Sequence, residues 1–340
     1  MNVFHEDHSQ WLSRYAEPVI DPNQRIIDPH HHLWPDMLGH VYNIDDFAVD
    51  TASGHNIVGT VFMECGAAYR EDGPPEERSL GETEYVLKQA ERSRQLDEAA
   101  PILGMVGRVD LRDSARLDEL LDKHLGLAGD FFKGIRHAGA SARDIDRQHL
   151  FIPGPAPADL YDQPSFRSSV RRLGSRDLSY DTWQYHYQLQ DFIALARACP
   201  DTQLILDHFS TPLGVGSWSG ERKAIFQTWK KEMIELSRCE NVVLKLGGLA
   251  MPDNGFGWHT ADTPPSSDDL LGAQADWYRH ALECFGAERC MFESNFPVDR
   301  LSLSYVVYWN AMKKLVAGAS QSEKDQLFHA TASRIYRLAS

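Results

Sequence analysis

The feature that most constrains the fold is a repeated alternation of apolar, β-branched runs with segments of helical periodicity. Eight such runs occur in the 340 residues, and most are followed by a stretch with helical spacing of its apolar residues. Parallel strands need crossover connections, which are usually helices. The alternation therefore predicts an α/β chain folded as a (β/α)8 TIM barrel. The predicted strands are Arg25–His32, Ile57–Cys65, Ile102–Leu111, Phe131–Gly139, Leu178–Tyr185, Gln203–His208, Val242–Ala250 and Arg289–Asn295.

The opposing model is an open, doubly wound sheet, which often carries a glycine-rich phosphate turn after its first strand. Here the first predicted strand ends in histidines, which favours the barrel. We expect residues 1–24 to form an irregular N-terminal arm and residues 25–340 to form a single barrel domain, with Ser322–Leu338 as a closing helix. Examples of the helical periodicity are Glu82–Leu96, Ser114–Leu125, Leu189–Ala198, Arg222–Ser237 and Ser267–Phe285.

Composition argues against several classes of partner. The 49 acidic and 34 basic side chains give a formal net charge of −15, and such a surface repels phosphate backbones, so nucleic acid is not expected. The five cysteines form no CxxC pair, which argues against a disulfide framework or a zinc finger. We find no apolar stretch long enough to cross a bilayer and no signal-peptide pattern at the start, so we expect a cytoplasmic protein without a membrane partner.

Three consecutive histidines end the first predicted strand, in the run Asp28-Pro29-His30-His31-His32. Because a strand places alternate side chains on one face, His30 and His32 are predicted to point the same way, with His31 opposed. Two converging imidazoles can share a divalent metal or bind an anionic substrate. The alternative is a buried turn whose histidines satisfy backbone groups. A pair that follows an aspartate on the first strand of a long α/β chain favours the functional interpretation.

Ionisable residues lie at the C-terminal ends of nearly all predicted strands, where barrels place their active sites. Burying unpaired charge is expensive, so packing alone does not explain them. His208 could be a ligand, an acid–base group or a helix cap, and His186 a ligand or part of an aromatic wall. Arg136 suits a substrate carboxylate or an internal ion pair, for instance with Glu64. The strand-end residues are His30, His32, Glu64, Arg136, His137, His186, Asp207, His208, Lys245, Glu293 and Asn295.

Four segments carry a resemblance to a known family: DPHHHLW at 28–34, FKGIRH at 132–137, LDH at 206–208 and RCMFESNFPV at 289–298. Over nearly its whole length the sequence resembles the amidohydrolase-related family (amidohydrolase 2 type) of the amidohydrolase superfamily. Relatives include lactonases acting on sugar lactones and on pyrone dicarboxylate, metal-dependent decarboxylases, and a few proteins that look like iron or manganese oxygenases. The resemblance implies a barrel with paired first-strand histidines at His30 and His32, and the fifth- and sixth-strand histidines at His186 and His208.

One departure from the family pattern affects the mechanism. The family commonly ends its eighth strand with Gly-Ser-Asp-Trp-Pro, and here the segment reads Glu293-Ser294-Asn295-Phe296-Pro297. The family aspartate serves as general base and often also as a metal ligand. The Asn295 amide has no useful basicity, although it can donate and accept hydrogen bonds. Glu293 on the same strand face, or Glu64 from the second strand, could supply the missing carboxylate.

The leading hypothesis is a metal-assisted hydrolase of a small cyclic ester or amide, in particular a lactonase. A divalent Zn, Mn or Fe ion held by His30, His32 and His208, together with Glu64 or Glu293, would polarise the carbonyl and acidify a water.

In the same hypothesis, His186 or Glu293 moves protons and Arg136 orients an acidic group of a small-molecule substrate, while Asn295 is left with hydrogen bonding. The rival hypotheses are a non-haem iron or manganese oxygenase or a decarboxylase on the same scaffold, and a non-catalytic partner of an active paralogue. Oligomers are common in the family, so we expect a homo-oligomer.

Overall fold

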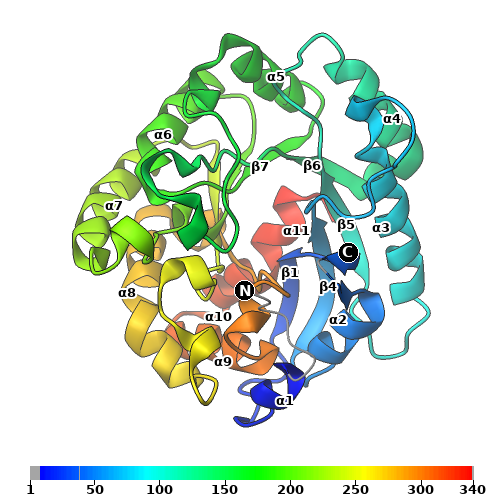
Figure 1. Ribbon diagram of the computed structural model, residues 1–340. Helices are drawn as coiled ribbons and strands as arrows, with labels where there is room; N and C mark the ends of the chain where they lie inside the picture. The colour runs from blue at the N-terminus through cyan, green and yellow to red at the C-terminus, as the bar shows by residue number, and fades with distance from the viewer. Residues whose placement is uncertain (1–7, 38, 339–340) are drawn as a thin grey trace.

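Eight parallel strands form one sheet that curves into a barrel, in the order β1-β4-β5-β6-β7-β8-β9-β10. The computed structural model describes residues 8–37 and 39–338, and Figure 1 shows the helices arranged around these strands. The (β/α)8 prediction is confirmed. The strands are β1 (Arg25–His31), β4 (Asn56–Met63), β5 (Ile102–Gly107), β6 (Phe132–Arg136), β7 (Ser179–Thr182), β8 (Leu204–Leu206), β9 (Val242–Leu246) and β10 (Cys290–Phe292).

The barrel closes between its first and last strands, just beyond their ends. His31 forms a parallel bridge with Phe296, and the His32 backbone N–H donates to the Phe296 carbonyl at 2.7 Å. The Asn295 N–H donates to the His30 carbonyl at 3.0 Å. Closure therefore draws the three-histidine segment and the segment after β10 together by backbone hydrogen bonds.

The predicted strands locate all eight observed strands but run past their C-terminal ends. The prediction Val242–Ala250 corresponds to β9, which ends at Leu246, and Ile102–Leu111 corresponds to β5, which ends at Gly107. The apolar pattern continues beyond these points because the following loop residues are also buried. Burial therefore continues past the point at which each strand ends and the backbone turns into a loop over the barrel.

Among the described residues, seven helices of ten residues or more cover the outside of the barrel. The predicted segments for α6 and α8 have the observed bounds, whereas α5 and α9 were not among the segments named as examples. In α9 the residues from Val307 to Lys313 are all buried, which hides the helical period in the sequence. None of the described helices is long and apolar enough to cross a membrane. The helices are α3 (Leu80–Ser93), α4 (Leu117–Ala128), α5 (Pro164–Gly174), α6 (Leu189–Ala198), α7 (Arg222–Leu236), α8 (Ser267–Phe285) and α9 (Tyr305–Leu315).

Two smaller regions complete the chain before β4. After β1, the hairpin β2 (Trp34–Met37) and β3 (His40–Tyr42) leads into α2 (Ile44–Thr51). The described part of the N-terminal arm contains the short helix α1 (His8–Leu12). Its Ile20 N–H donates to the Asn310 side chain in α9 at 2.8 Å. The division into an arm and one barrel domain stays a prediction.

The C-terminal segment fills the bottom of the barrel. The predicted helix Ser322–Leu338 is observed as α10 (Gln321–Asp325), a π-helical turn (Gln326–Ala330) and α11 (Thr331–Ile335), drawn in red in Figure 1. Ala332, Ile335, Tyr336 and Leu338 pack against the inward-facing strand residues Ile27, Val61, Met63, Val106, Ile205, Val243 and Met291. Several of these strand residues precede the polar strand-end residues, so the segment closes the end opposite the predicted site.

Tyr336 makes the polar contact between this segment and the barrel interior. Its hydroxyl donates to Asp181 Oδ2 at 2.5 Å, and both residues are fully buried. We expect Tyr336→Phe to lower the free energy of unfolding by about 1–3 kcal/mol, because a buried carboxylate loses a donor. Urea denaturation measures this. Tyr15→Phe is the control, because its hydroxyl bonds Glu17 in a less buried position and should cost less than about 0.5 kcal/mol. Equal losses of unfolding free energy in the two variants would contradict a stabilising role for the Tyr336–Asp181 hydrogen bond.

Candidate active site

Three histidines meet at the C-terminal end of the barrel. The Nε2 atoms of His30 and His32 lie 3.2 Å apart, and the rings of His30 and His208 have centroids 4.6 Å apart. His31 turns the other way and stacks on Phe47 with a centroid distance of 4.3 Å. The predicted alternation of the three histidines is therefore confirmed, although the pairing of β1 with β4 shifts register between Asp28 and His31. That irregularity includes Pro29, which has no N–H to contribute.

The Glu293 carboxylate connects two of these histidines. Its Oε1 is hydrogen-bonded to His208 Nδ1 at 2.7 Å, and its Oε2 lies 2.7 Å from His30 Nδ1. While Glu293 is ionised, its carboxylate can only accept and therefore favours a proton on Nδ1 of both rings. Desolvation by burial holds the pKa of His208 down at about 3 and that of His30 well below its ordinary value. Both rings are therefore neutral, with their Nε2 lone pairs available.

The third histidine is oriented by the backbone. His32 Nδ1 lies 2.8 Å from the Met63 carbonyl, which can only accept, so the proton sits on Nδ1. His30 Nε2 lies 3.3 Å from Arg136 Nη1, and His30 Nδ1 lies 3.3 Å from Lys245 Nζ, so the two cation contacts balance. The shorter 2.7 Å contact of Nδ1 with Glu293 Oε2 favours a proton on Nδ1 and a lone pair on Nε2. Two imidazole lone pairs, from His30 and His32, consequently face each other at 3.2 Å. The guanidinium partly offsets their repulsion.

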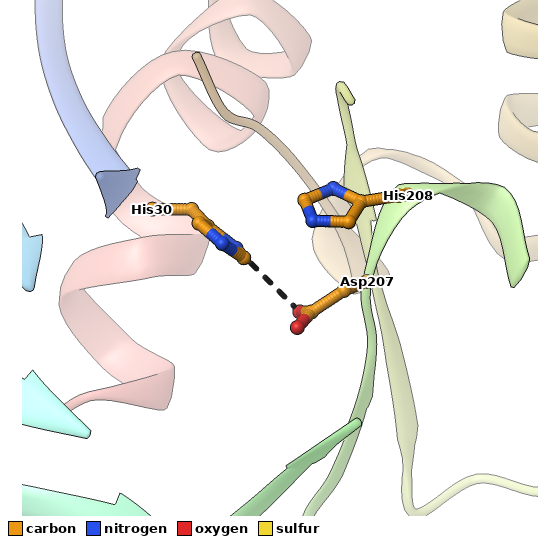
Figure 2. A group of neighbouring side chains, drawn as sticks. All are labelled: His30, Asp207 and His208. Atoms are coloured by element: carbon orange, nitrogen blue, oxygen red, sulfur yellow. Dashed lines mark ion pairs between the residues drawn. The ribbon is translucent and has the colours of Figure 1, made fainter. Parts of the chain in front are cut away.

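Asp207 joins the histidines as a further potential ligand. One ligand atom from each of His30, Asp207 and His208 lies within 4.8 Å of the other two, and Figure 2 shows the three side chains converging from β1 and from the chain just beyond β8. Asp207 Oδ1 is 3.8 Å from His30 Nδ1. Sequence analysis noted Asp207 at a strand end but gave it no role.

A left-handed turn explains why Asp207 and His208 both face the site. Consecutive residues of a strand point to opposite faces, so alternation predicts that only one of them faces inward. His208, Phe209, Ser210 and Thr211 have φ values of 55°, 57°, 61° and 35°. Left-handed backbone costs roughly 1–2 kcal/mol for each such residue, so the surrounding packing must hold this turn in place. The turn redirects the chain directly after Asp207 and brings the His208 ring back over the barrel.

Charged residues around the histidines form a connected, buried network. Arg136 Nε donates to Glu64 at 2.9 Å, and Arg136 Nη1 lies 3.6 Å from Asp207 Oδ2. Lys245 Nζ lies 3.3 Å from Asp207 Oδ1 and 3.0 Å from Asp181 Oδ2. Together with Glu293 this network holds two cations and four carboxylates, a formal charge of −2 when all are ionised.

The negative excess makes the network prone to take up positive charge. Desolvation by burial raises the pKa of Glu293 to about 8 despite the opposing effect of Lys245. Burial likewise raises the pKa of Asp207. Buried unbalanced charge is costly, so the network is stabilised either by protons or by a bound cation.

Glu64 and Arg136 pair with each other. Besides the 2.9 Å contact between their side chains, Arg136 Nη2 donates to the Glu64 carbonyl. The internal ion pair that the sequence left open for Arg136 is therefore the arrangement observed. Among the described residues, Glu64 makes no hydrogen bond or ion pair with His30, His32 or His208, so its predicted role as a metal ligand stays untested.

Asn295 makes structural contacts beyond the last strand, and its predicted place among the catalytic residues stays untested. It has a left-handed φ of 55°, which asparagine tolerates better than most residues, and its Nδ2 donates to Asp299 Oδ1 at 3.0 Å. Its backbone N–H makes the barrel-closing bond to His30 described above.

His186 lies apart from the three converging histidines. The backbone N–H of Leu213 donates to its Nδ1 at 3.3 Å, and its ring packs edge-on to Trp218 with a centroid distance of 4.7 Å. Across the described ranges, no hydrogen bond, ion pair or ring contact joins it to His30, His32 or His208. Its predicted catalytic role stays untested.

Comparison with known proteins gives the family and supports the fold. The amidohydrolase family model matches residues 27–338. The uncharacterised protein y4mH of Sinorhizobium fredii is 32% identical over 334 residues, covering 92% of this chain and 98% of the relative. An L-fucono-1,5-lactonase of Burkholderia multivorans is 27% identical over 265 residues, covering 76% and 77%. A Burkholderia multivorans amidohydrolase crystallised with bound zinc shares the fold, with a TM-score of 0.71, 23% identity and coverage of 92% and 99%.

Gly248, just after β9, leaves the space that the His208 ring occupies. A Cβ at this residue would overlap the ring, and the residue has a φ of +69°. Gly257 has a similar φ of +73°, but its nearest contact would be Thr260 Oγ1 at 4.0 Å. Both alanine variants are strained in the backbone, so Gly248→Ala should lose about 1–3 kcal/mol more of unfolding free energy than Gly257→Ala. Urea denaturation of both compares them, and equal losses would show that His208 is not held against this glycine.

Proposed function

Because the chain belongs to the amidohydrolase family, we propose that this hydrolase opens a small cyclic ester, a sugar-type lactone, at a divalent metal held by His30, His32 and His208. The lactonase part of the proposal is supported by the named relative, the L-fucono-1,5-lactonase of Burkholderia multivorans. The metal part is supported by the 3.2 Å approach of His32 Nε2 to His30 Nε2 and by the separate proximity of His30, Asp207 and His208, whose ligand atoms lie within 4.8 Å of one another.

The observation that carries the proposal is the pair of imidazole lone pairs facing each other. Two nitrogens bound to one tetrahedral zinc at 2.0–2.1 Å lie about 3.3 Å apart, and the two Nε2 atoms of His30 and His32 are 3.2 Å apart. Metal-binding histidines usually donate their other N–H to a carboxylate or a carbonyl. Glu293 and the Met63 carbonyl occupy these positions.

The surrounding charges fit the same interpretation. A divalent cation would neutralise the formal charge of −2 in the buried network, and Asp207 stands beside His30 and His208 as a fourth ligand candidate. The Arg136 Nη1 atom, 3.3 Å from His30 Nε2, would have to turn away from the ring while Nε keeps its 2.9 Å contact with Glu64. When bound, the ion would supply Lewis acidity toward the ester carbonyl and lower the pKa of a water. Zinc is the first ion to test, because a related amidohydrolase crystallised with it.

Glu64 is our candidate for the general base in place of the family aspartate. Glu64 is 8% exposed, whereas Glu293 and Asp207 are completely buried. Those two carboxylates also contact the histidines and Lys245. Arg136 holds one Glu64 oxygen at 2.9 Å and so orients the carboxylate. In the proposed reaction Glu64 removes a proton from the attacking water and returns it to the ring oxygen that leaves.

The charge network also points to the kind of lactone. Arg136 is engaged by Glu64 and lies beside Asp207, so it offers no free guanidinium for a substrate carboxylate. With a divalent ion bound, the network has no positive excess to attract an anion. We therefore favour a neutral, polyhydroxylated lactone over the acidic substrate expected from the sequence.

Zinc content should distinguish His32, a proposed ligand, from its neighbour His31, which faces away from the site. We expect the purified protein to hold about one zinc per chain after zinc loading and dialysis, and His32→Phe to reduce this at least about tenfold. His31→Phe is the matched control, because His31 stacks on Phe47 and faces away from the site. It should keep its zinc. Elemental analysis, with circular dichroism to verify folding, measures both, and equal zinc contents in the two variants would contradict the proposed ligand set.

Removing the Glu64 base should separate catalysis from metal binding. We expect Glu64→Gln to lower kcat for lactone hydrolysis by about 10²–10⁴ while zinc content stays unchanged, because the amide cannot accept the proton. A pH-indicator assay on sugar lactones measures the rate, and Glu77→Gln, at a carboxylate that is ion-paired with Lys123 outside the site, provides the matched control. A Glu64→Gln variant that keeps its kcat within about threefold would transfer the base role to another group.

A further inference from the structure

A second cavity lies outside the barrel wall, against helix α7. Its volume is about 240 Å³, which is smaller than sites for drug-sized ligands and suits a single small ring. Its walls come from the chain that follows β7, from the 3-10 turn Gly216–Trp218 and from α7. The residues that matter here are His186, Tyr187, Trp218, Glu221, Trp229 and Glu232. His186 thus belongs to this cavity, whereas the hydrolytic site proposed above lies inside the barrel.

Two side chains of this cavity have N–H groups without an acceptor. The Leu213 N–H donates to His186 Nδ1 at 3.3 Å, so Nδ1 is an acceptor and the proton of the neutral ring is on Nε2. Desolvation by burial lowers the pKa of His186 to about 4, which keeps the ring neutral. His186 is 7% exposed, and among the described residues neither its Nε2 nor the buried Nε1 of Trp218 has a hydrogen-bond partner. Buried donors of this kind are normally satisfied, so both call for an acceptor from outside the chain.

The same cavity also offers acceptors and aromatic faces. Glu232 is partly buried and Glu221 is exposed at the rim, and both line the cavity. Tyr187 and Trp218 stack with a centroid distance of 5.7 Å and an angle of 20°. Trp229, from the middle of α7, adds a third aromatic ring to the lining.

We propose that this cavity binds a neutral, polyhydroxylated ring of the monosaccharide type. Hydroxyl oxygens would accept from His186 Nε2–H and Trp218 Nε1–H, while hydroxyl protons would be donated to Glu221 and Glu232. The C–H face of a sugar ring packs on aromatic side chains. An anion would be repelled by the two carboxylates, and an ammonium ion would leave both N–H groups without an acceptor. The proposal is independent of the hydrolytic site.

The test follows the Trp218 indole N–H by ¹⁵N–¹H NMR in the full-length, zinc-loaded protein, with the signal assigned from Trp218→Phe. D-Glucose and D-galactose are titrated to about 100 mM, and a shift that saturates with a Kd on the order of 1–10 mM is expected for at least one of them. Thr228 is exposed on α7 and lines the cavity, so Thr228→Trp should fill it and weaken binding at least about tenfold. Gln227→Trp, at the neighbouring exposed position outside the lining, should leave the affinity unchanged.

Three outcomes would overturn the proposal. The first is an indole signal that does not shift with either sugar, which would mean that ordered water alone satisfies the two donors. The signal shifts with tetramethylammonium but with neither sugar, which identifies a cation site. Thr228→Trp and Gln227→Trp bind the sugars equally, which places the ligand elsewhere. Lactone hydrolysis by Thr228→Trp should match that of the unchanged protein, so failure of this proposal is distinguishable from failure of the hydrolytic one.

Discussion

The Glu293 carboxylate contacts Nδ1 of His30 and Nδ1 of His208, which come from opposite sides of the barrel, at 2.7 Å each. A single buried carboxylate, when ionised, thereby favours a proton on Nδ1 of each ring and leaves Nε2 as the nitrogen with the lone pair. At His30 this contact outweighs the longer 3.3 Å approach of Lys245 Nζ to the same Nδ1. The Met63 carbonyl accepts from His32 Nδ1 and orients that ring in the same way. Without these partners the imidazoles could rotate or exchange tautomers, and the facing lone pairs on which the proposed metal site depends would not be defined.

The fold supplies the conditions for this contact. Backbone hydrogen bonds close the barrel next to His30 and Asn295, and the left-handed turn after Asp207 brings His208 over the opening. The charge network continues from Asp207 through Lys245 and Asp181 to Tyr336 of the C-terminal segment. The apolar lower half of the barrel and the polar upper half are therefore joined by one chain of buried contacts. We infer that stability and the geometry of the site are coupled through this chain.

The sequence predicted much of this arrangement, because period-two and period-3.6 patterns are local. The eight strands, the barrel and the opposed direction of His31 all followed from such patterns. The turn at His208 could not be anticipated, since four left-handed residues without a glycine leave no signal in the sequence, and so Asp207 was left without a role. The pairing of Glu64 with Arg136, and the position of His186 beside Trp218, depend on side-chain directions after the strands end, which alternation does not predict. Helix α9, which is buried on nearly all sides, was not among the helical segments named.

The most direct test of the account is the protonation of the ring nitrogens in the zinc-loaded protein. Long-range ¹⁵N–¹H NMR of histidine side chains, assigned with single histidine variants, distinguishes a proton on Nδ1 from one on Nε2. We predict that His30, His32 and His208 all carry the proton on Nδ1, with Nε2 shifted by the metal. Spectra in which His30 and His32 carry the proton on Nε2 would contradict the account, because their lone pairs would then point toward Glu293 and Met63 rather than toward a shared ion.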